Sequence, residues 1–283
     1  MNFNTTSAKP FLTCKDHSIS GENFSLIHNR NLDLLKTDPI PENLEPYYES
    51  KDYISHTDGK TSVFEFVYQT VKNYALSLKL QHLKKYHPKK GRLLDLGAGT
   101  GDFLKRAKDK GWAISGVEPN MGARQKAEGK EVYLEKGLEK LKNNKYDAIT
   151  LWHVLEHVTN LEETIAQLKN ALEANGTLFI AVPNFKSFDA NHYQQFWAAY
   201  DVPRHIWHFS RTAIKAIFEN HELTLVETIP MKFDAYYVSL LSEKYKSGFM
   251  NPFKAFYIAS LSNYKARSTK EYSSLIYVLK HQK

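Results

Sequence analysis

The sequence predicts a doubly wound α/β fold, in which helices cover both faces of a mostly parallel sheet. From Arg92 onward, short apolar strands alternate with helical patterns. The first of these strands runs directly into a turn with glycine at alternate positions, residues 97–101. A helix expected at Asp102–Lys110 follows the turn. Because helix N-termini present unpaired N–H groups, this arrangement suits a nucleotide-like ligand.

Composition and charge restrict the class of protein. The chain has 283 residues, a formal net charge of +7 and a sequence pI of about 9.1. Its lysines are spread along the whole chain, which favours solvated helix surface over a nucleic-acid-binding patch. The single cysteine, Cys14, excludes an internal disulfide and fits a reducing cytoplasm. There is no signal-peptide pattern at Met1–Phe11 and no membrane-spanning run, so we expect a cytoplasmic protein.

The first part of the chain has no strong pattern of secondary structure. Residues 1–46 are polar and contain four prolines, so we expect them to be irregular. The following stretch, Tyr47–His56, is rich in aromatic side chains that need a surface to pack on. Ser62 is a suitable N-cap for a helix that runs to about Lys85, since apolar residues recur there every three or four positions.

Five strands are expected in the middle of the chain. They are Arg92–Leu96, Ala113–Glu118, Glu131–Leu134, Tyr146–Leu151 and Thr177–Val182. Between the last two, one helix spans Leu161–Leu172, with Gly176 beyond its end. Right-handed crossovers between parallel strands place ligands at the carboxyl ends of the strands.

The pattern after Pro183 is less regular. Residues 184–209 are rich in aromatic side chains and histidine, and we expect a loop there. The remaining elements are expected at Thr212–Asn220 (helix), Leu223–Glu227 (strand), Asp234–Lys246 (helix), after Asn251-Pro252 (helix) and Ser273–Leu279 (strand). The two strands would form an antiparallel edge of the sheet with a long insertion between them.

The glycine turn and two acidic residues form the strongest functional signal. The glycines are spaced G-x-G-x-G, whereas a dinucleotide-binding turn has G-x-G-x-x-G, and position 102 is Asp102. Asp95 lies two residues before the first glycine, where it could meet an ammonium group directly or through water. Glu118 ends the second strand, where a carboxylate can accept both hydroxyls of a ribose. Together these features indicate a nucleoside-containing cofactor.

Residues 92–183 resemble the class I S-adenosylmethionine-dependent methyltransferases. Asp95–Gly101 resembles the first motif of that family, and Glu118 matches its ribose-binding acid. Leu155-Glu156-His157-Val158 is similar to the group close to the ubiquinone-pathway O-methyltransferases. The resemblance implies a Rossmann-like sheet of seven strands in the order 3-2-1-4-5-7-6, with the last strand antiparallel.

The resemblance also implies which residues hold S-adenosylmethionine. Gly97 and Gly99 would approach its methionine part, and Trp152-His153 would face the sulfonium. The adenine would lie near Pro119-Asn120-Met121 and Gly137-Leu138. The full expected set is Asp95, Gly97, Ala98, Gly99, Gly101, Glu118, Pro119, Asn120, Leu138, Trp152 and His153.

Methyl transfer from a sulfonium needs alignment and exclusion of water, and it needs a base only if the acceptor loses a proton. The candidate catalytic residues are therefore three histidines, His153, His157 and His205. A structural role for His157 at a helix start, bonded to backbone groups, is equally compatible with the sequence. Leu151-Trp152-His153-Val154 differs from the Asn-Pro-Pro-Tyr pattern of base N-methylation, which favours an oxygen or carbon acceptor.

The acceptor is expected to contact two regions. One is the loop Tyr200–Phe209, and the other is the aromatic stretch near Tyr53. Arg204 could hold an acidic group of the substrate, or it could pair with Asp201. The candidate substrate-binding residues are Tyr53, His56, Tyr200, Arg204 and His208.

We expect residues 1–60 to form an N-terminal extension and lid, and residues 61–283 to form the methyltransferase domain with substrate-side insertions at 184–210 and 233–270. Thr37–Pro41 resembles a stretch that follows a small zinc-binding region in some relatives, but the chain has only Cys14, His17 and His28 as ligands nearby. Because structural zinc takes four protein ligands, we interpret the extension as a degenerate zinc-ribbon remnant and expect no metal.

The aromatic region 233–258 permits two interpretations. It could contact a lipid-like or quinone-like acceptor, or it could be the packed core of an inserted helical pair.

The sequence thus predicts an S-adenosylmethionine-dependent methyltransferase that acts on an oxygen or carbon of a small molecule. The alternatives are a non-catalytic S-adenosylmethionine-binding protein of the same fold and, less favoured, an RNA methyltransferase or a nicotinamide-dependent oxidoreductase. Neither the acceptor nor the oligomeric state is indicated by any pattern in the chain.

Overall fold

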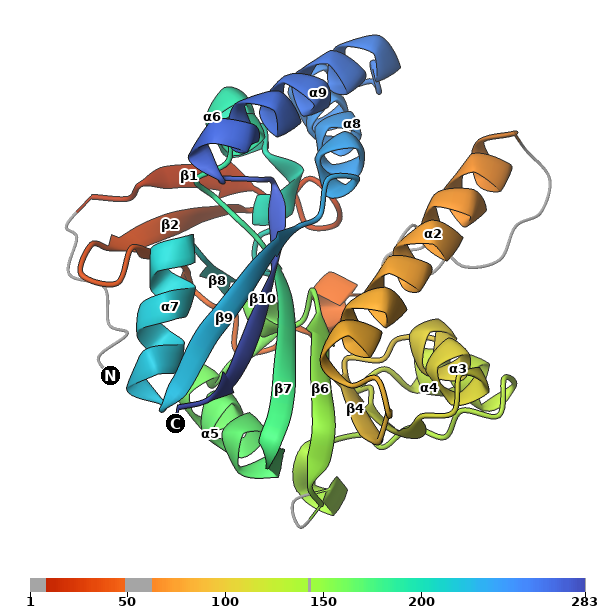
Figure 1. Ribbon diagram of the computed structural model, residues 1–283. Helices are drawn as coiled ribbons and strands as arrows, with labels where there is room; N and C mark the ends of the chain where they lie inside the picture. Colours follow the sequence, from red (N-terminus) through yellow and green to blue (C-terminus); the bar gives the residue numbers. More distant parts are fainter. Residues whose placement is uncertain (1–8, 49–62, 142–143, 283) are drawn as a thin grey trace. The chain divides into compact units, whose positions relative to one another are not determined.

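The computed structural model describes residues 9–48, 63–141 and 144–282 (Figure 1). These residues form two compact units. Unit 1 comprises the described part of Met1–Ser50, together with His153–Thr164 and Ile180–Val278. Unit 2 comprises the described parts of Lys51–Trp152 and Leu279–Lys283, together with Ile165–Phe179. The domain boundary predicted at residue 60 lies outside the described residues, so it stays a prediction.

Unit 2 contains the strand, the glycine turn and the helix that the sequence analysis singled out. Its elements are α2 (Val63–Tyr86), β4 (Arg92–Leu96), α3 (Asp102–Asp109), β5 (Ala113–Val117), α4 (Met121–Glu128), the 3₁₀ turn η2 (Leu138–Leu141), β6 (Tyr146–Trp152), most of α5 (Leu161–Ala171) and the start of β7 (Leu172–Pro183). Strand β4 pairs in parallel with both β5 and β6. Its residues Leu93–Leu96 are buried, as a central parallel strand requires.

The larger sheet has six strands in the order β5-β4-β6-β7-β10-β9. This is the expected order without its third strand, so the strand predicted at Glu131–Leu134 is wrong. That segment makes only an isolated parallel bridge, between Val117 and Glu135. The backbone explains why. The Val132 N–H donates to the Ala127 carbonyl of α4 at 3.1 Å, so it is not available for hydrogen bonds to a neighbouring strand.

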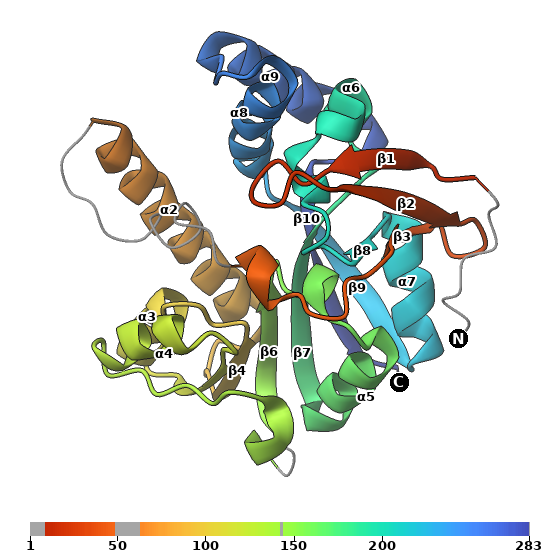
Figure 2. The ribbon, with the colours of Figure 1, turned by 180° about the vertical axis from the view of Figure 1, so that it is seen from behind.

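The prediction that residues 1–46 are irregular is also wrong. Three strands in this part of unit 1, β1 (Leu12–Lys15), β2 (Asn23–Asn29) and β3 (Leu34–Asp38), form an antiparallel sheet with β8 (Trp207–His208) (Figure 2). Phe24 and Leu26 alternate with more exposed residues along β2 and lie in the same core as Trp197. The sheet is stabilised by partners distant in sequence, which local patterns do not reveal.

The remaining elements of unit 1 include the predicted α7, β9, α8, α9 and β10, together with short helices that were not predicted. They are η1 (Glu45–Tyr48), η3 (Leu155–His157), the end of β7, α6 (Phe188–Tyr193), η4 (Gln194–Phe196), η5 (Ala198–Tyr200), α7 (Arg211–Asn220), β9 (Leu223–Pro230), α8 (Asp234–Ser247), α9 (Pro252–Thr269) and most of β10 (Ser274–His281). The expected loop 184–209 therefore contains three short helices and β8. Gly176 lies inside β7 and does not end α5, because the strand begins directly at Leu172.

Helices α8 and α9 form the insertion predicted between the last two strands. They pack against one another, and α9 also packs on α6 (Figure 1). No helix in the described part of the chain is both long enough and apolar enough to cross a membrane.

Candidate active site

The turn between β4 and α3 is left-handed at each of its three glycines. The φ angles are 68° at Gly97, 54° at Gly99 and 76° at Gly101. A Cβ built at Gly99 would meet no atom within 4 Å, so the backbone there faces open space. At Gly101, by contrast, a Cβ would lie 2.9 Å from the Cβ of Ala127. Gly99 thus leaves room for a ligand, whereas Gly101 allows α4 to pack closely.

The Glu118 carboxylate fixes the geometry of this turn. The backbone N–H of Gly99 donates to Glu118 Oε2 at 2.9 Å, and the N–H of Asn120 donates to Oε1 at 2.9 Å. Asn120 in turn caps α4, since its side chain accepts from the Ala123 N–H at 2.9 Å. One carboxylate therefore connects the glycine turn to the start of the next helix.

Asp95 is buried beneath the turn and is not presented at its surface. It is only 2% exposed, and its Oδ1 accepts a hydrogen bond from Thr150 Oγ1 at 2.6 Å, across β4 and β6. Burial raises the pKa of Asp95 to about 7, although the Thr150 hydrogen bond acts in the opposite direction. In this structure Asp95 thus braces the carboxyl ends of two neighbouring strands.

Four more of the residues predicted at the cofactor also belong to unit 2. The Ala98 N–H bonds to the Val117 carbonyl at 2.9 Å, and Pro119 directly precedes Asn120, the N-cap of α4. Leu138 begins η2. Trp152, at the end of β6, has the ammonium group of Lys79 4.6 Å from its ring centroid.

His153, the first residue after β6, belongs to unit 1 and is held between two carboxylates. Its Nδ1 lies 3.3 Å from Glu156 Oε1, and its Nε2 lies 3.0 Å from Asp234 Oδ2. The backbone is left-handed here, with φ 57°, which is uncommon for a non-glycine residue. Burial alone would lower the pKa of His153, but Asp234 and Glu156 raise it to about 10. The imidazole is therefore cationic at neutral pH.

His157 and His205 are adjacent in the same unit. Their ring centroids lie 4.5 Å apart, with the rings nearly perpendicular. His157 Nδ1 is 3.0 Å from the Arg204 carbonyl, and His205 Nδ1 is 2.9 Å from the Ala199 carbonyl. A carbonyl can only accept, so we assign the N–H of each ring to Nδ1 and a lone pair to each Nε2. Burial and the neighbouring His205 lower the pKa of His157 to about 4.

Glu156 completes this cluster of polar groups. Its side chain is 1% exposed, and its Oε2 has no hydrogen-bond partner among the described residues. Burial would raise the pKa of Glu156, but His153 lowers it, so the group is anionic. Glu156, His157 and His205 each offer one ligand atom, and the three atoms lie within 4.8 Å of one another. Two imidazoles and one carboxylate can bind a divalent transition metal. This cluster lies apart in sequence from the Cys14 region considered above.

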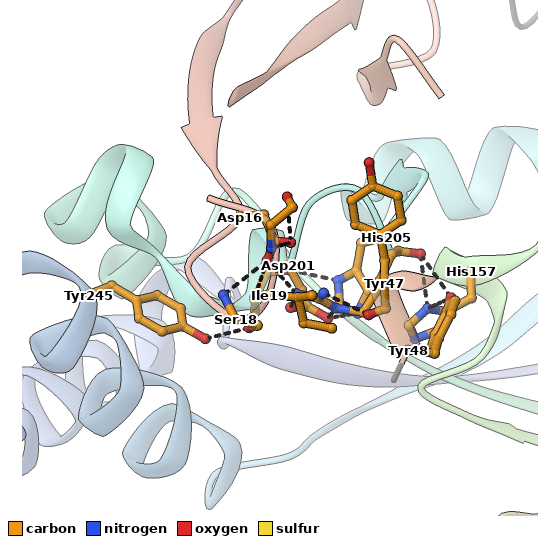
Figure 3. A network of polar contacts seen from close by, with 12 residues as sticks. Asp16, Ser18, Ile19, Tyr47, Tyr48, His157, Asp201, His205 and Tyr245 are labelled. Atoms are coloured by element: carbon orange, nitrogen blue, oxygen red, sulfur yellow. Dashed lines mark hydrogen bonds and ion pairs between the residues drawn. The ribbon is translucent and has the colours of Figure 1, made fainter. Parts of the chain in front are cut away.

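Arg204 is the centre of a buried ion-pair network, and Figure 3 shows three of its partners, Asp16, Tyr47 and Asp201. Its Nη2 lies 2.6 Å from Asp201 Oδ1 and 3.1 Å from Asp16 Oδ1, and its Nη1 donates to the Tyr47 carbonyl at 2.9 Å. The guanidinium is only 3% exposed. Of the two interpretations of Arg204, pairing with Asp201 is the one observed.

The remaining predicted substrate residues are either buried or outside the described residues. Tyr200 is 3% exposed and packs its ring 5.0 Å from that of Trp197. His208 is 4% exposed and its Nε2 lies 3.0 Å from Thr37 Oγ1. Tyr53 and His56 lie outside the described residues.

Two residues of the histidine cluster were not singled out from the sequence. Asp234 is 81 positions from His153 in the chain, so no local motif connects them. Tyr48, whose hydroxyl lies 3.1 Å from His157 Nδ1, was noted only as part of an aromatic stretch. Glu156 was quoted as part of the Glu-His pair but received no role.

Comparison with known families agrees with the geometry of the turn. A family profile described as "Methyltransferase domain" matches residues 68–228, which is more than half of the chain. The chain belongs to this methyltransferase family. The predicted family and the prediction that the chain is a methyltransferase are thereby confirmed.

Individual relatives agree with this family. Over 100 residues the chain is 32% identical to the ubiquinone biosynthesis O-methyltransferase of Rickettsia canadensis. The matched stretch covers 32% of this chain and 42% of that protein. The match thus spans less than half the length of this curated relative.

Two solved structures of the magnesium protoporphyrin IX methyltransferase of Synechocystis have the same fold. The one with bound SAH has a TM-score of 0.56 at 12% identity and covers 84% of this chain and 97% of its own. The one with bound SAM has a TM-score of 0.52 at 13% identity and covers 84% and 94%. These similarities confirm the predicted α/β fold, in which helices flank a mostly parallel sheet.

Proposed function

We propose that this chain transfers a methyl group from S-adenosylmethionine to a hydroxyl oxygen of a small molecule. The observation that carries the choice of oxygen is the cluster of Glu156, His157 and His205. One ligand atom from each of the two imidazoles and one from the Glu156 carboxylate lie within 4.8 Å of one another, and the buried Glu156 Oε2 has no hydrogen-bond partner among the described residues. A hydroxyl acceptor must lose its proton during transfer, and this cluster can accept that proton.

The residues of the glycine turn fit S-adenosylmethionine. Open space beside Gly99 allows a ligand to approach the backbone, and each Glu118 oxygen accepts one N–H while keeping further lone pairs for ribose hydroxyls. When bound, the cofactor supplies an activated methyl group on its sulfonium. We assign its binding to Gly97, Ala98, Gly99, Gly101, Glu118, Pro119, Asn120, Leu138 and Trp152, with Asp95 bracing the strands below.

We assign different roles to the three candidate histidines. His153 stays protonated because its pKa is raised to about 10, so it serves to hold Glu156 and not as a base. His157 is neutral because its pKa is lowered to about 4, and its Nε2 can accept a proton or a hydrogen bond. A proton arriving at the His157–His205 pair would be stabilised by the Glu156 carboxylate.

In our proposal Tyr200, Arg204 and His208 hold the residues around this cluster in place, and they do not contact the acceptor. Arg204 already has two carboxylate partners, and its backbone carbonyl accepts from His157. A contribution of Tyr53 and His56 to acceptor binding stays a prediction.

The experiment has a binding arm and a catalytic arm. Isothermal titration with S-adenosylhomocysteine measures cofactor binding, and absence of any heat would contradict the proposal. Methyl transfer is then measured with a panel of phenols and other hydroxyl compounds, for the unmodified chain, Glu156→Gln, His157→Gln and the distant control His281→Gln. We expect the first two variants to lose about 10²-fold or more in kcat while cofactor affinity stays unchanged.

A chelator distinguishes proton transfer from metal activation at the same cluster. If EDTA leaves the rate unchanged, His157 and His205 act as bases. If EDTA removes activity and a divalent ion restores it, the three groups act as metal ligands that lower the pKa of the hydroxyl. Transfer to carbon acceptors alone would contradict the choice of oxygen, and turnover of no acceptor would favour the non-catalytic alternative.

A further inference from the structure

Helix α9 in unit 1 has an inverted distribution of side-chain sizes. Its inner face is mostly made of small residues, since four of its five buried positions are alanine or serine; the five are Ala255, Ile258, Ala259, Ser262 and Ala266. Its outer face carries large aromatic side chains, which are exposed by 88% at Phe253, 64% at Phe256, 64% at Tyr257 and 68% at Tyr264. An ordinary surface helix has the reverse arrangement, with large apolar residues inward and polar residues outward.

The exposed aromatic residues lie on one side of the helix. At about 100° per residue, Phe253, Phe256, Tyr257 and Tyr264 fall within roughly 100° of one another around the helix axis. The turn that joins α8 to α9 adds Phe249 and Met250, which are 61% and 43% exposed. We call these six residues the aromatic face. Exposed aromatic side chains gathered on one side of a helix are typical of an interaction site.

The charge around the aromatic face is strongly positive. Residues 232–270 contain seven basic side chains and two acidic ones, a net charge of +5 out of +7 for the whole chain. Asp234 pairs with His153, and the buried Glu243 pairs at 3.1 Å with Lys254, which is one of the seven basic side chains. A hollow at the end of α9 is lined by Tyr264, Lys265, Arg267, Ser268 and Thr269. Its ammonium, guanidinium and hydroxyl groups are suitable donors for an anion.

We propose that the aromatic face docks on the surface of an anionic phospholipid bilayer. Phenylalanine and tyrosine side chains partition into the boundary between headgroups and acyl chains, while lysine and arginine beside them attract lipid phosphates. The helix lies along the membrane plane in this arrangement. Charge complementarity favours this occupant over an apolar protein surface, since residues 232–270 carry a net charge of +5 that an apolar surface would not neutralise. The inference is independent of the acceptor proposed above.

The test is co-sedimentation of the full chain with phosphatidylcholine vesicles, with and without phosphatidylglycerol. We expect binding to the anionic vesicles that weakens with salt. The double variant Phe253→Ser/Tyr257→Ser should bind at least about tenfold more weakly. Lys265→Gln/Arg267→Gln should lose about fivefold per residue. The matched controls are Tyr133→Ser, an exposed tyrosine of unit 2 at 75%, and Lys215→Gln on α7, and both should bind as the unmodified chain does.

Several results would overturn the proposal. The first is that the unmodified chain does not sediment with anionic vesicles. The second is that the aromatic variant, Phe253→Ser/Tyr257→Ser, binds as well as Tyr133→Ser. If the aromatic variant instead abolishes self-association measured by analytical ultracentrifugation and no vesicle binding occurs, the occupant is a second copy of the chain. Thermal unfolding of each variant is measured in parallel, and because the substituted side chains are exposed, we expect little change in Tm.

Discussion

Replacing Gly99 by alanine tests whether the open space beside the turn is a ligand site. The backbone of Gly99 is left-handed, with φ 54°, and an added Cβ would meet no atom within 4 Å. The folded chain therefore has room for the methyl group and bears only the conformational cost of alanine in this region, about 1–2 kcal/mol. A ligand that approaches the Gly99 backbone, however, would collide with the added methyl group.

Gly248, at the end of α8, offers a matched control. Its φ is 82°, and a Cβ there would also meet nothing within 4 Å. Gly248→Ala therefore has the same backbone cost as Gly99→Ala but lies in unit 1, away in sequence from every residue that we assign to the cofactor. The two variants should lose equal stability, with Tm lowered by a few degrees.

The variants should differ in cofactor binding. We expect Gly99→Ala to weaken binding of S-adenosylhomocysteine by about 10–100-fold, because an added methyl group in a filled site costs about 1–3 kcal/mol. Gly248→Ala should bind as the unmodified chain does. Isothermal titration measures both affinities, and differential scanning calorimetry measures both Tm values. An affinity of Gly99→Ala within about twofold of the unmodified chain would refute the reasoning, as would equal losses in both variants.

Three further predictions follow from buried charges. The raised pKa of His153 stabilises the folded state. This contribution is fully present below pH 6.5 and is lost as the pH rises through about 10. Over this range Tm should therefore fall more steeply for the unmodified chain than for His153→Gln. Equal slopes would contradict it. The pKa of Asp95 is raised from 3.8 to about 7, so the unmodified chain loses stability as the pH rises from about 4 to about 7 and loses no more above that. Asp95→Asn should therefore gain Tm relative to the unmodified chain between about pH 4 and about pH 7, and a constant difference over that range would contradict this. Arg204→Lys cannot reproduce the forked contacts with Asp201 and Asp16 and should lose about 3–5 kcal/mol in chemical denaturation, whereas a loss below about 1 kcal/mol would contradict the network.

The strands and helices around the glycine turn could be predicted because their signals are local. Strand β4 is a run of apolar residues that ends at alternate glycines, and β5 and β6 repeat the pattern with helices between them. The bounds predicted for β4, α3, β5 and β6 are correct to within one residue, whereas no bounds were predicted for α4, and β7 begins at Leu172 instead of the predicted Thr177. The segment near Val132 was mispredicted because one backbone hydrogen bond to α4 removes it from the ladder.

The N-terminal sheet and the histidine cluster could not be predicted because their contacts are distant in sequence. Lys36 on β3 pairs with Trp207 on β8, and Asp16 pairs with Arg204, 188 residues away. The sequence makes His157 and His205 candidates but does not indicate which nitrogen of each ring carries the proton. That depends on the carbonyls of Arg204 and Ala199, which only the folded chain places there.

The two N–H groups that Glu118 accepts affect how fast a ligand can bind. With Gly99 and Asn120 bonded to the carboxylate, contacts within the chain fix the shape of the turn. A ligand then has no loop to order, and the loss of backbone entropy that often slows and weakens association is avoided. Association should be close to limited by diffusion, and amide exchange at Gly99 should be slow even in the ligand-free chain.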